Sequence, residues 1–146
     1  MKTPVFVRPL FVVAAVYDGL LGLAFLFASG PIYELCGVAP PNHFGYVHFP
    51  AALLVVFALM FAAVAARPSA NRNLIPYGML LKVSYCAVVL FHWLWSGIPF
   101  MWKPFCLFDF VFLVLFAWAF VVLRPDGTVQ RRDPDGAKPS QAEVSE

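Results

Sequence analysis

The feature that most constrains this chain is an apolar segment, residues 73–95, that carries two ionisable side chains, Lys82 and His92. The segment is long enough to cross a bilayer, because a membrane helix needs about 20 mostly apolar residues. A lysine inside such a span costs roughly 2.5 to 3.5 kcal/mol on insertion, so its ammonium group requires a carboxylate, a carbonyl oxygen or water. The partners of Lys82 must therefore come from other spans of the chain.

The composition of the chain is typical of a membrane protein. Hydrophobic residues make up 62% of the 146 residues and charged residues only 12%, compared with roughly 25% charged residues in an ordinary soluble domain. No basic segment is interleaved with aromatic residues, so nucleic acid is not an expected partner. The partner expected from composition is the lipid bilayer.

Four apolar runs approach the length that a membrane helix needs. They cover residues 9–29, 46–66, 74–95 and 105–123. The predicted fold class is therefore all-α, a four-transmembrane-helix bundle that occupies residues 1–123. The loop between the first two runs is apolar enough to predict a short interfacial helix around residues 32–36. Residues 124–146 are rich in Pro, Gly, Ser and charge, and they are predicted to form a disordered cytoplasmic tail.

The positions of lysine and arginine predict the orientation of the bundle. One side of the predicted spans carries Lys2, Arg8, Arg67, Arg72, Arg124, Arg131, Arg132 and Lys138, and the opposite side carries only Lys103. Because the positively charged side of a membrane protein faces the cytoplasm, both termini are predicted to be cytoplasmic.

Asp18 and Lys82 are predicted to form an intramembrane ion pair. They lie about nine and about eight residues from the cytoplasmic boundary, which places them at similar depth at a rise of about 1.5 Å per residue. Pairing removes the cost of burying either charge alone and docks the first span on the third. Two interpretations stay open: a structural clasp between helices, or a charge that relays protons or ions or holds a ligand.

A second polar group is predicted near the outer face. His48, His92 and Asp109 lie on three different spans within roughly two turns of that face, and His43 in the preceding loop can join them. Tyr85 shares one helical stripe with Lys82 and His92 and is a candidate hydroxyl relay. A histidine with a carboxylate can close a hydrogen-bonded network, hold a small molecule or quinone, or bind a metal or haem. No HxxxH or HxxH pair occurs in one helix, so metal and cofactor stay unassigned.

Small residues predict how the helices approach one another, since small side chains at helix interfaces allow close packing in lipid. The predicted face of the first span consists of Ala14, Asp18 and Gly22. The predicted face of the second span consists of His48, Ala51, Ala52, Val55, Leu59 and Ala62.

The three cysteines, Cys36, Cys86 and Cys106, form no CxxC pair and no zinc-like spacing. Cys36 and Cys106 both fall near the predicted outer face, so a disulfide between them is one alternative. The other alternative, which is the commoner one, is that all three cysteines are unpaired and act as small apolar residues.

The first hairpin resembles a known family. The stretch Tyr17-Asp-Gly-Leu-Leu-Gly-Leu-Ala-Phe-Leu-Phe27, followed by Gly30-Pro-Ile-Tyr-Glu-Leu-Cys-Gly37, is similar to the DoxX-like group of small four-span bacterial membrane proteins. The resemblance implies a multi-pass bundle in the bacterial inner membrane, in some cases with quinone-linked or thiol-linked redox partners. It carries over no catalytic residue.

Three functions remain open on these residues. The favoured one is a non-enzymatic membrane protein that binds a hydrophobic or small ligand, or that serves as the membrane subunit of a partner complex. The second is a quinone-, metal- or haem-linked redox subunit that uses His48, His92 and Asp109. The third is a small proton-coupled transporter that uses Asp18 and Lys82 and assembles as a homo-oligomer. The chain has no nucleotide-binding loop and no nucleophile elbow, which disfavours a kinase or hydrolase.

Overall fold

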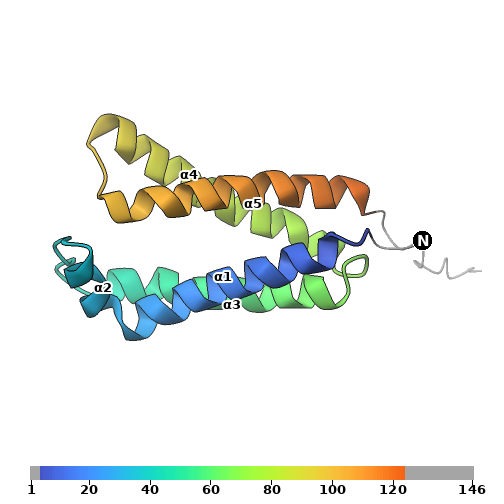
Figure 1. The fold of residues 1–146 in the computed structure, drawn as a ribbon, viewed down its shortest axis with the longest axis horizontal. Helices are drawn as coiled ribbons and strands as arrows, with labels where there is room; N and C mark the ends of the chain where they lie inside the picture. Colours follow the sequence, from blue (N-terminus) through green and yellow to red (C-terminus); the bar gives the residue numbers. More distant parts are fainter. Residues whose placement is uncertain (1–3, 124–146) are drawn as a thin grey trace, which may run out of the picture.

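A computed structural model of the chain describes residues 4–123, and these residues form a helical bundle (Figure 1). The four long helices are α1 (Val7–Phe27), α3 (Gly45–Ala66), α4 (Ile75–Trp95) and α5 (Lys103–Val122). A short helix, α2 (Ser29–Leu35), follows α1, and two single 3-10 turns, η1 (Arg72–Leu74) and η2 (Phe100–Trp102), precede α4 and α5. The predicted all-α four-helix fold is confirmed, and each long helix is long and apolar enough to cross a membrane.

The short helix predicted in the first loop is α2, and the chain turns sharply on both sides of it. Ala28 separates α1 from α2 with φ −132° and ψ 24°. At the far end Gly37 has φ +64°, a left-handed conformation that glycine adopts without steric cost. The amide of Val38 donates to the carbonyl of Tyr33 and the amide of Gly37 to that of Glu34, a Schellman pattern that satisfies the last carbonyls of the helix.

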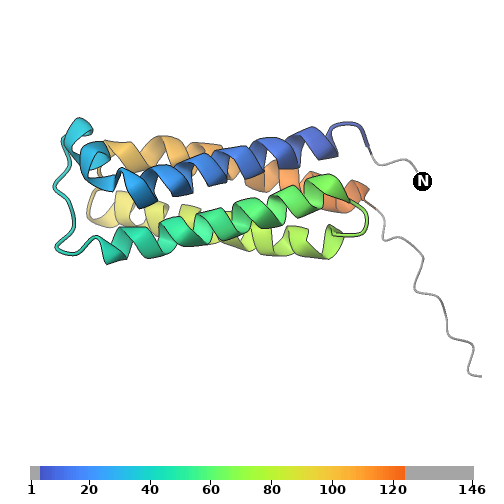
Figure 2. The same ribbon diagram turned by 90° about the horizontal axis from the view of Figure 1, so that it is seen from below.

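The bundle consists of two hairpins that meet through a large core at one end and through a smaller cluster, which includes Phe25, Tyr33 and Met101, at the other. Helices α1 and α3 pack along their length, as do α4 and α5 over much of theirs. The contacts between the hairpins are far fewer, and α4 runs obliquely, so that its C-terminal half leaves α1 and α3 (Figures 1 and 2). The hairpins therefore converge where the described chain begins and ends, and diverge at the opposite end, which carries α2.

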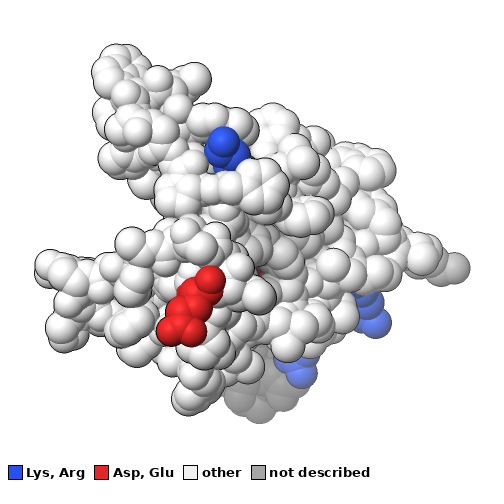
Figure 3. Space-filling model, turned by 60° about the vertical axis from the view of Figure 1, so that its left-hand side comes forward, with Lys and Arg blue, Asp and Glu red and all other residues white. Residues whose placement is uncertain are grey.

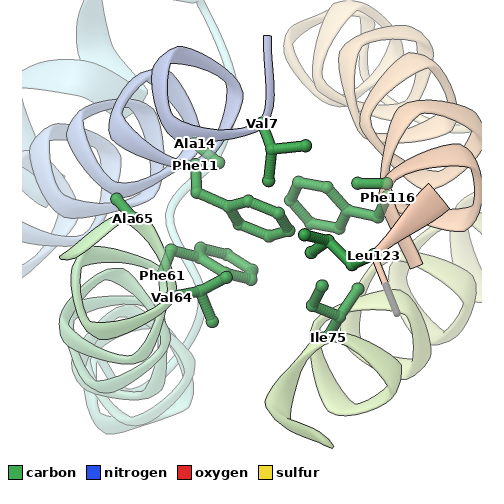
Figure 4. Close-up of a cluster of buried hydrophobic side chains, with 10 residues drawn as sticks. Val7, Phe11, Ala14, Phe61, Val64, Ala65, Ile75, Phe116 and Leu123 are labelled. Carbon is green, nitrogen blue, oxygen red and sulfur yellow. The ribbon is translucent and has the colours of Figure 1, made fainter. Parts of the chain in front are cut away.

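An aromatic core holds the convergent end together. The ring of Phe11 stacks on Phe116 with centroids 4.8 Å apart, and Phe61 lies 6.0 Å from Phe11 and 5.0 Å from Phe116. Val7, Val64, Ile75 and Leu123 surround the three rings (Figure 4). Because every long helix contributes to this core, it closes the convergent end of the bundle with tightly packed apolar side chains.

The small-residue face predicted for α1 is buried, but the one predicted for α3 was largely wrong. Ala14, Asp18 and Gly22 all lie in the interior. On α3 the buried residues are Ala51, Ala58, Phe61, Val64 and Ala65, and Leu59 is 69% exposed. The predicted face was counted from His48. In the structure, Gly19 and Gly22 of α1 bring the two helices together, and the part of α3 that they approach, around Ala51 and Ala58, is the buried one.

Replacement of Gly22 by alanine should destabilise the α1–α3 hairpin. A Cβ atom at Gly22 would lie 2.7 Å from the carbonyl oxygen of Ala51 and 2.9 Å from the side chain of Val55, and a backbone atom cannot move aside. We expect Gly22→Ala to lower the free energy of unfolding in detergent by about 1–3 kcal/mol. Gly19→Ala is the matched control, since its Cβ atom would make an ordinary 3.4 Å contact with Ala58. Equal stability of the two variants would contradict the close approach.

Both described ends of the chain lie at the convergent end (Figures 1 and 2). The predicted orientation, with both termini cytoplasmic, stays a prediction, and the predicted tail of residues 124–146 lies outside the described residues. Cys36 is exposed at the α2 end, whereas Cys86 and Cys106 are buried, and all three thiols are free. Cys36 therefore reports on which side of the membrane the α2 end lies.

We expect a membrane-impermeant maleimide to label Cys36 in right-side-out membrane vesicles. The buried thiols of Cys86 and Cys106 should not react before the protein unfolds. The first control is Cys36→Ser, which should abolish labelling. The second is the double variant Cys36→Ser with Ala70→Cys, whose new thiol lies in the exposed loop at the other end and should react only after permeabilisation. The reverse pattern would place the termini outside.

Candidate functional site

A buried charge cluster joins three of the four long helices. The ammonium nitrogen Nζ of Lys82 on α4 lies 2.7 Å from Oδ1 and 2.9 Å from Oδ2 of Asp18 on α1. The same nitrogen lies 2.9 Å from Oδ1 of Asp109 on α5. The side chains of Lys82 and Asp18 are each 1% exposed, and that of Asp109 is 10% exposed. We call these three residues the charge triad.

Helical periodicity explains how each member of the triad reaches the interior. Asp18 continues the buried face of α1, and Lys82 continues a buried stripe of α4 that includes Gly78 and Val89. Asp109 lies seven positions before Phe116, which is about two turns of helix and places both residues on the core-facing side of α5. The three charges therefore meet because each occupies a core position of its own helix.

Aromatic rings surround the ammonium group on the sides that the carboxylates leave free. Nζ of Lys82 lies 5.5 Å from the ring centre of Tyr17, 5.6 Å from that of Phe112 and 6.0 Å from that of Phe61. The faces of aromatic rings attract cations within about 6 Å. The ammonium group therefore has two carboxylates and three aromatic rings within about 6 Å.

The two carboxylates are not equivalent. Asp18 accepts a hydrogen bond from Lys82 at each oxygen, whereas Asp109 contacts the same nitrogen through Oδ1 at 2.9 Å, an ion pair with poorer geometry than either hydrogen bond to Asp18. The hydroxyl oxygen of Tyr17 is buried without a hydrogen-bond partner among residues 4–123. Asp18 is therefore the main partner of Lys82, and Asp109 is the more weakly held of the two carboxylates.

A cavity of about 340 Å³ lies between the diverging hairpins, on the side of the triad away from the aromatic core. Its walls are mainly apolar, and the polar groups Tyr17, Asp18, Tyr85 and Asp109 line it where it meets the triad. Figure 3 looks toward the divergent end, where charged side chains are sparse and a recess separates two lobes of the surface. The structure therefore combines an apolar chamber with charged groups at its base.

The side of the cavity formed by α3 is partly open. Tyr46, Pro50 and Leu53 line the cavity and are also exposed on the surface of the bundle. Leu81 and Tyr85 of α4 form part of the opposite wall. The opening accordingly lies along α3, on a surface that faces lipid if the long helices span a bilayer.

The predicted convergence of His48, His92 and Asp109 was wrong. His92 is exposed and its Nδ1 lies 3.3 Å from Oγ of Ser96 on its own helix. Nε2 of His48 lies 3.2 Å from Oγ of Ser29, and Asp109 contacts Lys82 instead of either histidine.

The oblique course of α4 explains part of this outcome, because the C-terminal half of α4, which includes His92, leaves α1 and α3 (Figure 1). The opposite charges of Asp109 and Lys82 also attract each other more strongly in an apolar interior than a carboxylate attracts a neutral imidazole.

The remaining predicted site residues lie apart from one another. His43 is exposed in the loop before α3, and its Nδ1 accepts a hydrogen bond from the amide of Gly45 at 3.0 Å. Tyr85 donates a 3.2 Å hydrogen bond to the backbone oxygen of Trp102, so it does not bridge Lys82 and His92. Within residues 4–123, no group of three or more His, Cys, Asp or Glu side chains is placed to hold a metal ion.

The sequence did not indicate that Tyr17 lies beside the triad or that Trp102 lines the cavity. Tyr17 immediately precedes Asp18, and adjacent helical residues do not share a face, so periodicity did not place Tyr17 beside the triad. The aromatic wall of the cavity includes Trp102, which stacks on Phe25 with centroids 5.7 Å apart. That contact joins η2 to α1 and depends on how the two hairpins are placed.

The comparisons with known proteins add no relative: no protein-family model, curated protein or solved structure matches the chain. The resemblance of residues 17–37 to DoxX-like proteins is therefore a proposal, and the function is argued from the geometry above.

Substitutions of the three triad residues should lower the unfolding free energy by unequal amounts. Lys82→Met leaves two buried carboxylates without a cation and should cost about 3–5 kcal/mol of unfolding free energy. Asp18→Asn should cost less, because Lys82 keeps Asp109 as a partner. The double variant should recover part of the loss of Lys82→Met, as measured by denaturant titration of helicity in detergent.

The matched control for this cycle is Lys103→Met. Lys103 lies over the ring of Trp93 at 4.7 Å, outside the triad, so its loss should change stability little. Strictly additive losses for Asp18→Asn and Lys82→Met would contradict a direct interaction between them.

Proposed function

We propose that this protein is a small integral membrane protein that binds a small, largely apolar molecule in the cavity between its two hairpins, without acting on it chemically. The observation that carries the proposal is the cavity of about 340 Å³, whose apolar walls end at the charge triad. Binding sites for small molecules are typically mainly apolar pockets of roughly 300–1,000 Å³ with a few well-placed polar groups.

The architecture supports a cavity that persists rather than a gap that collapses. The aromatic core of Phe11, Phe61 and Phe116 fixes the convergent end, and the triad ties α1, α4 and α5 together about midway along the bundle. Beyond the triad, Trp102 packs between Phe25 and Phe105 and supports the cavity wall. These contacts fasten the hairpins to each other on both sides of the triad, and the cavity lies between the triad and the contacts of Trp102.

The other two interpretations receive different support. A redox site built from His48, His92 and Asp109 lacks geometric support, since the three side chains do not meet. A proton-coupled transporter is favoured by one observation: the cavity reaches the triad from the divergent side, whereas the aromatic core closes the other side. Transport needs a second conformation that opens that core, and ligand binding does not, so binding is the function proposed.

The membrane setting completes the proposal. The resemblance to DoxX-like proteins and the distribution of lysine and arginine support a multi-pass protein of the bacterial inner membrane with cytoplasmic termini. In that setting the cavity lies in the outer half of the bilayer and opens toward lipid beside Tyr46 and Leu53. A partner subunit or a second copy of the chain would then approach from the lipid-facing surface.

Filling the cavity should abolish binding. Leu54 is half-buried on α3 and lines the cavity, so Leu54→Trp places an indole ring in the space for the ligand. We expect native mass spectrometry of wild-type protein, released from membranes in a mild neutral detergent, to show a retained small-molecule adduct. Most of that adduct should be absent from Leu54→Trp.

The matched control is Val56→Trp, which adds the same ring to an exposed position of the same helix, 59% accessible and outside the cavity. This variant should keep the adduct. Equal retention by both variants, or wild-type protein without any adduct, would contradict a ligand site in the cavity.

A further inference from the structure

We infer that the cavity selects molecules that carry a protonated amine on an apolar body, with the carboxylate of Asp109 as the counter-ion of the amine. This inference rests on the proposed function, since it names the class of molecule that the cavity would take. It follows from three observations: the charge balance of the triad, the unequal exposure of its members, and the aromatic character of the adjoining wall.

The charge balance of the triad leaves room for a second cation. Lys82 supplies one positive charge, whereas Asp18 and Asp109 supply two negative charges when both are ionised. Within residues 4–123 these are the only oppositely charged side chains in contact, and Arg72 is instead bonded to the backbone oxygen of Phe120. An uncompensated charge is costly in an apolar interior, so a bound cation gains an interaction that a neutral molecule of the same shape does not.

The accessible carboxylate is Asp109. Its side chain is 10% exposed, compared with 1% for both Asp18 and Lys82. Asp109 lines the cavity and contacts Lys82 through Oδ1 at 2.9 Å, whereas Asp18 accepts hydrogen bonds from Lys82 at both oxygens. An ammonium group in the cavity can therefore meet Asp109 while Lys82 keeps its two hydrogen bonds to Asp18.

The wall next to Asp109 suits the rest of such a molecule. Tyr17, Phe25, Tyr85, Trp102 and Phe105 all line the cavity. Aromatic faces attract ammonium groups and also provide large apolar contact areas for an alkyl or aryl body. An anionic molecule would meet like charge at the same position.

The test compares matched probes that differ only at one end. Wild-type protein in a neutral detergent at pH 7 is titrated by calorimetry with 4-phenylbutylamine, with 4-phenyl-1-butanol and with 5-phenylpentanoate. We expect the amine to bind at least about tenfold more tightly than the alcohol, which corresponds to one well-formed charged contact, and the carboxylate to bind most weakly. This order is measurable on wild-type protein and does not depend on the folding of any variant.

Two variants assign the preference to Asp109. Asp109→Asn keeps the shape of the side chain and should bring amine and alcohol to equal affinity. Glu34→Gln removes an exposed carboxylate of α2 that does not line the cavity, and this variant should preserve the preference. If Glu34→Gln abolishes the preference or Asp109→Asn retains it, the assignment to Asp109 is overturned.

Failure of this inference is distinguishable from failure of the proposed function. Equal binding of amine and alcohol to the wild type, with both lost in Leu54→Trp, would overturn the amine preference and leave a cavity for neutral molecules. Tighter binding of the carboxylate would overturn it as well. Absence of binding by all three probes, together with wild-type protein free of any adduct, would overturn both proposals.

Discussion

The interaction on which the rest of this structure depends is the contact of one lysine with two aspartates inside an apolar bundle. Lys82 cannot remain in such an environment without a counter-charge, and Asp18 and Asp109 approach it from two other helices within 2.7 and 2.9 Å. Because separating a buried charge from its partner is costly, the triad disfavours arrangements in which the faces of α1, α4 and α5 that carry it do not meet, and apolar packing supplies the remaining stabilisation.

The triad lies at the boundary between two differently built halves. On one side, Phe11, Phe61 and Phe116 fill the space between all four long helices with stacked rings. On the other side, the oblique course of α4 takes its C-terminal half away from α1 and α3 and leaves a cavity beside the smaller cluster of Phe25 and Trp102. One end of the bundle is therefore a packed core, and the other is a chamber with charged groups at its base. That asymmetry is the observation on which the proposed ligand binding rests.

The sequence predicted a contact correctly where the depth of two residues along their helices was enough to pair them. Asp18 and Lys82 could be paired because each lies a similar number of residues from the same boundary, and the structure places them in contact. The same reasoning failed for Asp109, which was grouped with His48 and His92. Depth along a helix does not reveal the direction in which the helix runs, and the tilt of α4 takes His92 out to the surface while the side chain of Lys82 meets Asp109.

The sequence by itself determined that the chain forms four apolar helices with buried charges, because hydrophobic length and the cost of an unpaired ion are properties of residues and their spacing. It also placed the small residues of α1 on the inner face. Only the tertiary structure decided that α3 turns a different stripe inward, that Asp109 completes a triad, and that Tyr17, Trp102 and Phe105 line a cavity. These features depend on the angle between two hairpins, and that angle results from the packing of many side chains together.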